Sequence, residues 1–165
     1  SPTFHRRLLL SAAIDAADAR ALVALARTLK RSAAVPGRLR GKNIALLSTH
    51  AAGEGVRRFD AVATALGARV AHVEPAPAWL DADMPIDEQA ARLFESLYDA
   101  VDCEELPPGF AQRLQARLAL PVYDGLASDD HPIFRLLPQV ADDAAAPRDE
   151  DRCALLQAAL VGSLL

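Results

Sequence analysis

The segment Leu46–Asp60, LLSTHAAGEGVRRFD, decides the fold because three patterns follow one another within it. Apolar residues end a strand-like run that begins at Asn43, the glycines at 53 and 55 mark a turn, and a helix-like pattern follows the turn. Such a turn presents free backbone N–H groups and the positive end of a helix dipole, which suit an anion. Glu54 lies between the two glycines, so a carboxylate stands where a phosphate group is expected.

The rest of the chain continues this alternation of strands and helices. A helix over 56–66 ends at Gly67, and a second strand over 69–73 completes a βαβ unit. A helix through about residue 33 is expected after a cap at Asp15 or Asp18, and further helices are expected over 86–97 and 110–118. Further strands are expected over 100–103 and 120–125. This order predicts an α/β fold, namely a three-layer, doubly wound, four-stranded parallel sheet.

The end of the chain predicts two more helical elements. Pro132 lies in the first turn of a helix for which Asp129 or Asp130 is the expected cap. A polar stretch over 141–149 then leads to a final amphipathic helix over 151–164, which we expect to pack on the same domain.

The composition limits the classes of function. The chain has 165 residues and a formal net charge of −4, without a basic face interleaved with aromatic residues, so neither nucleic acid nor a membrane is an expected partner. The four histidines are scattered without ligand spacing, and neither a metal nor another cofactor is predicted. Cys103 and Cys153 lack CxxC spacing, which favours a reducing compartment. Because no signal peptide or membrane span is evident either, we expect a cytoplasmic protein.

Four strings, in this order, resemble the carbamoyl-phosphate-binding domain of aspartate and ornithine carbamoyltransferases. They are RGKNIALLS (40–48), VRRFDAVATALGARVAHVEP (56–75), AARLFESLYDAV (90–101) and LPVYDGLASDDHP (120–132). We expect a single domain over 1–165, in which about 5–141 resembles the carbamoyl-phosphate-binding domain and about 142–165 forms a linker and a helix similar to the family's final helix. It also implies that the family's second domain, which binds the amino-acid acceptor, is missing.

The resemblance shows which ligand-binding groups have changed. In the family, a Ser-Thr-Arg-Thr-Arg motif at the first helix N-terminus holds carbamoyl phosphate. The five matching positions carry Ala52, Gly53, Glu54, Gly55 and Val56, while a further family arginine falls near Glu104 and a glutamine falls on Phe134. Losing two arginines and gaining two acids is expected to cost on the order of 5 kcal/mol, or about a thousandfold or more in affinity.

Several candidate residues keep two interpretations each. His131 matches the family histidine that donates to the carbamoyl oxygen, or it is a helix-entry histidine bonded to neighbouring backbone. Arg57 and Arg58 supply replacement charge for the ligand, or they lie solvated on the helix surface. Glu54 interacts with the helix N-terminus as an exposed carboxylate, or it joins Glu104 in facing a cationic or hydrated ligand across the strand ends.

Trp79 lies in the proline-rich loop over 74–85. In the family, the corresponding loop reaches a neighbouring subunit's active site, so we expect this tryptophan to pack at a subunit interface.

Together, the resemblance and the missing motif predict a degenerate carbamoyltransferase-like domain of amino acid metabolism, a pseudoenzyme that acts in binding, assembly or regulation. The family implies a homotrimer, and an intact carbamoyltransferase is a further candidate partner. Two alternatives stay open. One is the carbamoyl-phosphate-binding part of a split carbamoyltransferase, and the other is a binder of another small molecule at the strand carboxyl ends.

Overall fold

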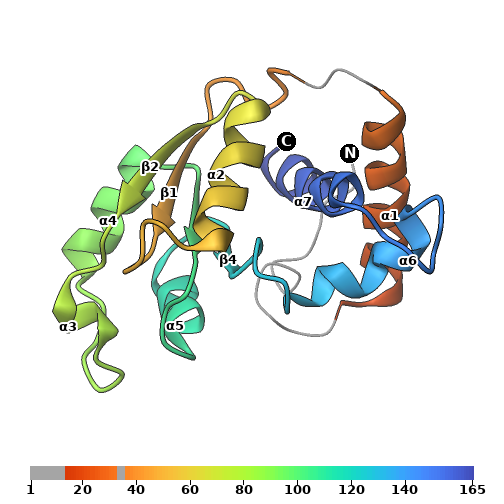
Figure 1. Cartoon of the computed structure of the whole chain (residues 1–165). Helices are drawn as coiled ribbons and strands as arrows, with labels where there is room; N and C mark the ends of the chain where they lie inside the picture. Colours follow the sequence, from red (N-terminus) through yellow and green to blue (C-terminus); the bar gives the residue numbers. More distant parts are fainter. Residues whose placement is uncertain (1–13, 33–35) are drawn as a thin grey trace.

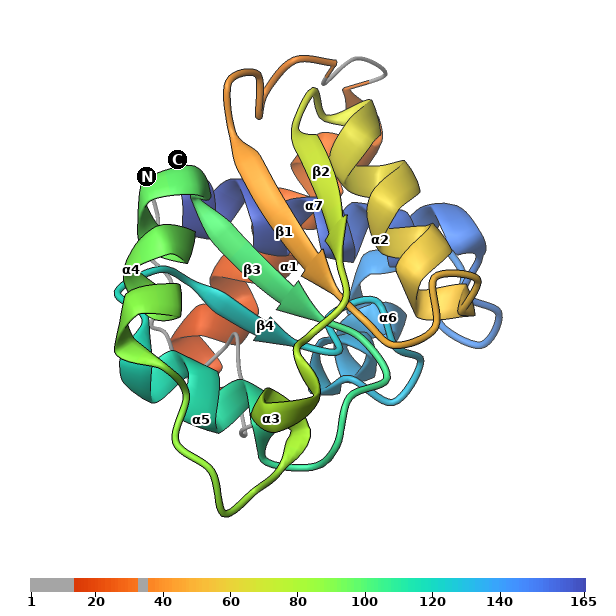
Figure 2. The same cartoon turned by 90° about the vertical axis from the view of Figure 1, so that its left-hand side faces the viewer.

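A computed structural model describes residues 14–32 and 36–165, and its four strands form one parallel sheet. The strands are β1 (Asn43–Leu47), β2 (Arg69–Val73), β3 (Ala100–Cys103) and β4 (Val122–Asp124), in the order β2-β1-β3-β4. The chain moves from β1 to one side of the sheet and then returns to its other side, so the strand order reverses between β1 and β3 (Figure 2). This confirms the predicted doubly wound parallel sheet.

Helices cover both faces of the sheet (Figure 1). The helices on one side are α1 (Ala16–Arg31), α2 (Glu54–Ala65), α6 (Leu137–Val140) and α7 (Asp149–Leu164), with the 3-10 helix η2 (Pro132–Leu136). The other side carries α3 (Pro77–Leu80), α4 (Glu88–Leu97) and α5 (Phe110–Arg117). Alternate β1 residues enter the two cores, because Ile44 and Leu46 pack on the α2 side whereas Ala45 and Leu47 pack on the α5 side.

The final helix differs from the expected amphipathic one. Helix α7 lies between α2 and the outer helix α1 (Figure 1), and buried residues surround most of its circumference. Asp151, at its first turn, is 2% exposed and pairs with Lys30 Nζ of α1 at 2.6 Å. A helix enclosed on two sides needs apolar residues all round, so the expectation of one polar face was wrong.

Two expected boundaries lie at the edge of the described residues. Helix α1 begins after Asp15, whose side chain accepts a hydrogen bond from Asp18 N at 2.8 Å, and it ends at Arg31. Residue 33, where we expected the helix to end, and residue 5, where the family resemblance begins, both lie outside the described residues.

Within the described ranges, no helix is both long and apolar enough to cross a membrane.

Candidate functional site

The glycine turn leads directly from β1 into α2, as the sequence predicts. Helix α2 begins at Glu54, two residues earlier than expected, and Gly53 is its N-cap residue without a side-chain hydrogen bond to the helix. Ala52 is exposed in the turn. Because β1 borders the point where the strand order reverses, this turn lies where open α/β sheets place their ligands.

Two carboxylates from the segment after β3 fill the space beside this turn. A Cβ atom on Gly53 would lie 2.5 Å from Glu105 Oε2, and a Cβ atom on Gly55 would lie 2.6 Å from Glu104 Oε2. Any side chain larger than hydrogen at either glycine would therefore collide with a carboxylate. Glu105 reaches this place with a left-handed backbone, φ +55°, which is uncommon for a residue with a side chain. The protein's own acids thus lie against the start of α2, where the helix dipole favours negative charge.

Glu104 belongs to a buried pair of carboxyl groups. Its side chain is fully buried, and Oε1 accepts a hydrogen bond from Ala127 N at 3.0 Å. Asp102 lies two residues earlier on β3 and is also fully buried. Burial raises the pKa of both carboxyl groups, and the neighbouring Glu104 carboxylate raises that of Asp102 further. The pair therefore favours a state in which Asp102 holds a proton.

Arg58 fixes α2 to the loop that follows β4. Its Nη1 donates to Ala127 O and to Asp129 Oδ1, both at 2.8 Å, and its Nη2 lies 3.4 Å from Glu54 Oε1. The guanidinium group is thus already engaged by the protein. Arg57 is exposed on the same helix.

Glu54 and Glu104 do not meet at an open surface. The Glu54 side chain is 81% exposed and pairs with Arg58, whereas Glu104 is fully buried. The exposed carboxylate across the strand ends from Glu54 is that of Glu105, which lines the same pocket. The glutamate that lines a pocket together with Glu54 is therefore Glu105 and not the expected Glu104.

His131 caps the 3-10 helix η2, so the expected cap at Asp129 or Asp130 was wrong. Its Nδ1 accepts a hydrogen bond from Ile133 N at 3.2 Å, as in the interpretation of a helix-entry histidine. The side chain is 4% exposed, and burial lowers its pKa from 6.5 to about 4. Since Nδ1 is an acceptor, the ring carries its proton on Nε2, and within the described part of the chain this buried atom has no hydrogen-bond partner.

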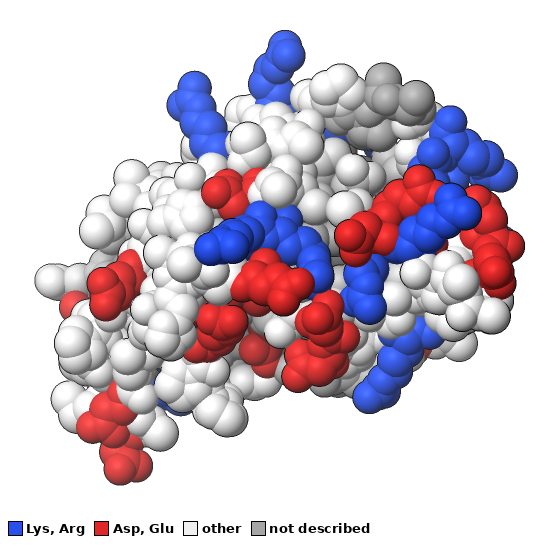
Figure 3. All heavy atoms as spheres, in the orientation of Figure 1, with Lys and Arg blue, Asp and Glu red and all other residues white. Residues whose placement is uncertain are grey.

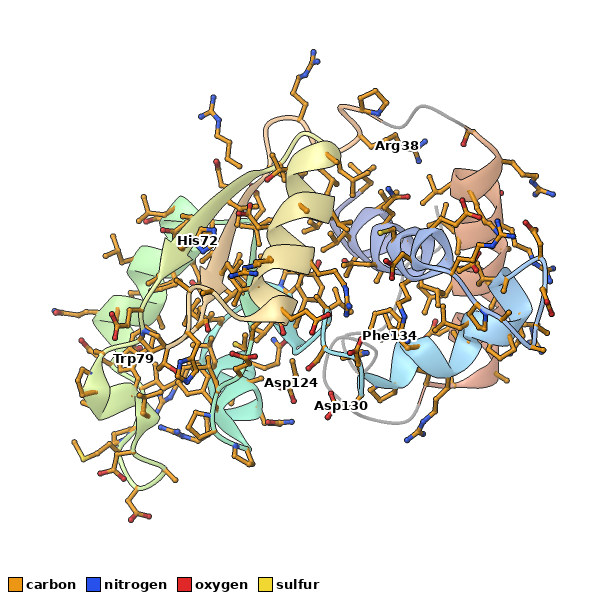
Figure 4. The ribbon with its side chains drawn as sticks, in the orientation of Figure 1. Arg38, His72, Trp79, Asp124, Asp130 and Phe134 are labelled. Atoms are coloured by element: carbon orange, nitrogen blue, oxygen red, sulfur yellow. The ribbon has the colours of Figure 1, made fainter. Side chains whose placement is uncertain are left out.

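Two adjoining pockets open at the carboxyl ends of the strands. A pocket of about 220 Å³ is lined by residues that include Cys103, Asp124 and His131, and a second of about 240 Å³ is lined by residues that include Glu54 and Arg58. Glu105, Ser128 and Asp130 line both. Figure 4 shows Asp124 and Asp130 at the same end of the sheet, and Figure 3 shows acidic side chains gathered among basic ones in the same orientation of the molecule. Among the described residues, no group of three or more His, Cys, Asp or Glu side chains is placed to hold a metal ion.

Trp79 lies within its own domain core. It belongs to α3 and is 9% exposed, and its ring packs on that of Phe94 of α4 with centroids 5.5 Å apart (Figure 4). An aromatic contact inside the chain therefore accounts for its burial. A role at a subunit interface stays a prediction.

Comparison with known proteins agrees with this architecture. No protein-family model matches the chain. The catabolic ornithine carbamoyltransferase of Burkholderia mallei is 31% identical over 132 residues, which make up 78% of this chain and 39% of that protein. The crystal structure of ornithine carbamoyltransferase from Thermus thermophilus matches 74% of this chain with a TM-score of 0.60 and 19% identity, covering 42% of that chain.

The chain is similar in sequence to ornithine carbamoyltransferases, and it shares its fold with solved ornithine and aspartate carbamoyltransferases. Aspartate transcarbamoylase from Trypanosoma cruzi, solved in complex with phosphate, shares the fold over 75% of this chain and 40% of its own, with a TM-score of 0.56 and 21% identity. This carbamoyltransferase-like chain spans about 39% of the length of the first curated relatives.

Glu105 and Asp102 are site residues that were not predicted from the sequence. Both belong to the string Asp102-Cys103-Glu104-Glu105, three acids around the end of a buried strand. Acids at such a place are unusual because burial disfavours their charge. That pattern was the available signal, and it pointed to the whole string rather than to Glu104 alone.

Proposed function

We propose that this carbamoyltransferase-like domain neither binds carbamoyl phosphate nor transfers a carbamoyl group, and that it acts in assembly or regulation. The observation that supports this proposal is the filling of the glycine turn by the protein's own acids. Glu105 lies against Gly53 and Glu104 lies against Gly55, so an anion at the start of α2 would have to displace or neighbour two carboxylates.

The energetic argument rests on charge. One unit charge about 4 Å from a carboxylate is repelled by about 1 kcal/mol in water and by about 4 kcal/mol at the effective dielectric constant of ~20 typical near a protein surface. Arg58, near the start of α2, already donates hydrogen bonds to Asp129 and to Ala127 O. A thousandfold loss of anion affinity corresponds to about 4 kcal/mol. Repulsion by the two glutamates is therefore large enough to exclude phosphate at millimolar concentration.

The proposal on assembly rests on an exposed apolar surface of helix α4. Leu93 and Leu97 lie one turn apart on α4 and are 57% and 52% exposed. Two large apolar side chains on one helix face suit a contact with another protein chain. We propose a homotrimer, as the family resemblance implies, and an intact carbamoyltransferase as a further partner. The same proposal includes a cytoplasmic location. It also includes a single domain over 1–165, with the carbamoyl-phosphate-binding-like part over about 5–141 and a linker and helix over about 142–165.

Neutralising the two acids at the turn tests the first part. The variant Glu104→Gln/Glu105→Gln keeps the shapes of both side chains and removes their negative charge. We expect inorganic phosphate to bind this double variant at least tenfold more tightly than the unaltered protein, measured by amide chemical shifts of the α2 N-terminus. Glu88→Gln, an exposed acid on α4, is the matched control and should leave the affinity unchanged. Equal phosphate affinity of all three proteins would contradict the charge argument.

Light scattering tests the second part. We expect a mass of three times the 17.6 kDa of the chain, and a shift toward the monomer in the variant Leu93→Ser/Leu97→Ser. Leu165→Ser removes a similarly exposed leucine elsewhere and should leave the mass unchanged. A monomeric protein that also fails to co-elute with an intact carbamoyltransferase would overturn the assembly role.

A further inference from the structure

The pockets at the strand ends are rich in negative charge. Their lining includes five acids, namely Glu54, Glu105, Asp124, Asp129 and Asp130, and one basic side chain, Arg58. Arg58 forms ion pairs with Asp129 and Glu54. Among the described residues, the carboxylates of Glu105 and Asp130 have no ion-pair partner within 4 Å. A place at a helix N-terminus that would ordinarily attract anions therefore repels them and attracts a cation.

His131 supplies an independent sign of a ligand. His131 is one of the residues that line the 220 Å³ pocket, and only 4% of its surface is exposed. The hydrogen bond from Ile133 N to Nδ1 fixes the proton on Nε2, and that buried N–H group has no acceptor within the described chain. A buried donor without a partner is unfavourable, and a ligand oxygen that accepted its hydrogen bond would remove that cost.

This arrangement distinguishes between classes of ligand. A metal ion would need a free lone pair on Nε2, but that nitrogen carries the ring proton as long as Nδ1 accepts from Ile133 N. A phosphate or a carboxylate could accept from Nε2, but it would face Glu105 and Asp130. A neutral amide would satisfy Nε2 and leave the acids without a counter-charge. A ligand that carries both an ammonium group and a neutral oxygen acceptor satisfies both sides of the pocket.

We propose that this pocket binds a small organic monocation with a neutral carbonyl or hydroxyl oxygen. Its ammonium group lies near the carboxylates of Glu105 and Asp130, and its oxygen accepts the hydrogen bond from His131 Nε2. This inference rests on the proposed function in one respect, since it requires a strand-end site that is closed to anions. It adds that the site has changed its charge preference and still recognises a small molecule.

The test uses four small probes and the full chain. Glycinamide carries an ammonium group and a carbonyl oxygen, acetamide lacks the charge, glycine adds a carboxylate, and inorganic phosphate is the anion. Each is titrated at pH 6.5 while nitrogen-15 signals of the His131 ring and the backbone amides of Gly125 and Ser128 are followed. We expect glycinamide to shift these signals at a concentration at least tenfold lower than acetamide or glycine.

Two variants assign the interaction to named groups. Asp130→Asn is expected to weaken glycinamide binding at least threefold, and Glu105→Gln/Asp130→Asn at least tenfold, with acetamide affected by neither. Glu88→Gln, with the same charge change on α4, should bind glycinamide as the unaltered protein does. Equal shifts with glycinamide and acetamide, or variants that bind glycinamide unchanged, would overturn the inference.

The phosphate arm separates this inference from the proposed function. Phosphate binding at micromolar concentration would contradict the proposed function and the inference together. If neither phosphate nor glycinamide binds at millimolar concentration, the cation site is refuted while the closed anion site stands.

Discussion

Replacement of His131 by glutamine is expected to flatten the acid side of the protein's stability profile. The imidazole is 4% exposed, and burial lowers its pKa from 6.5 to about 4 although the carboxylates of Asp124 and Asp130 act in the opposite direction. In the unfolded chain the same ring titrates near its ordinary pKa. Between these two values the unfolded state binds one more proton than the folded state, so stability falls as the pH falls.

The magnitude follows from that interval. Each pH unit between 6.5 and 4 costs up to about 1.4 kcal/mol, so His131 removes about 3 kcal/mol from the free energy of unfolding across the window. The stability is complete above pH 6.5, and no further loss from this group follows below pH 4. Glutamine does not titrate, and its amide can still accept a hydrogen bond from Ile133 N.

Urea unfolding at pH 7.5, 6.5, 5.5 and 4.5 measures this effect. Carboxyl groups that titrate in the same range contribute to both proteins, so the difference between the variant and the unaltered chain isolates His131. We expect the variant to gain more than 2 kcal/mol relative to the unaltered protein from pH 7.5 to 4.5. His72→Gln, at a half-exposed histidine paired with Asp60, is the matched control and should show no such gain. Parallel stability profiles for His131→Gln and the unaltered protein would refute a buried, neutral His131.

Two further predictions concern packing. Gly55→Ala is expected to destabilise the fold by about 1–3 kcal/mol, because its Cβ would lie 2.6 Å from the buried Glu104 Oε2. Gly53→Ala should cost less, because the side chain that its Cβ would meet, Glu105, is exposed and can move. Urea unfolding compares the two variants, and equal losses of stability would contradict the geometry. Tyr123→Phe removes the 2.6 Å hydrogen bond to Ser163 Oγ and is expected to lower the free energy of unfolding by about 1 kcal/mol in the same assay. An unchanged urea midpoint would show that this buried hydrogen bond does not stabilise the fold.

The fold could be predicted from the sequence because its strongest signals are local. The apolar run before Gly53, the helical spacing after it and the break at Gly67 define one βαβ unit within about thirty residues. Alternation of the remaining elements then determines a doubly wound sheet. Helix α7 itself was predicted, but its burial on most sides could not be, because that burial depends on α1, which lies more than a hundred residues away in the chain.

The candidate site was predictable only in part, because its geometry depends on contacts between distant segments. The string around Gly53 and Gly55 marks the turn, and the family resemblance marks His131. The place of Glu105 depends on its left-handed backbone at φ +55°, which nothing in its side chain favours. The hydrogen bond that makes His131 rather than Asp130 the cap depends equally on tertiary packing around η2.

Calorimetric titration of the full chain with carbamoyl phosphate, next to inorganic phosphate, tests the closed anion site most directly. With Glu104 and Glu105 against the glycine turn, the account predicts no binding of either anion at millimolar concentration. Micromolar binding of carbamoyl phosphate that is lost in His131→Ala would contradict it. That result would mean that the two glutamates move aside and that the chain supplies the carbamoyl-phosphate site of a split carbamoyltransferase.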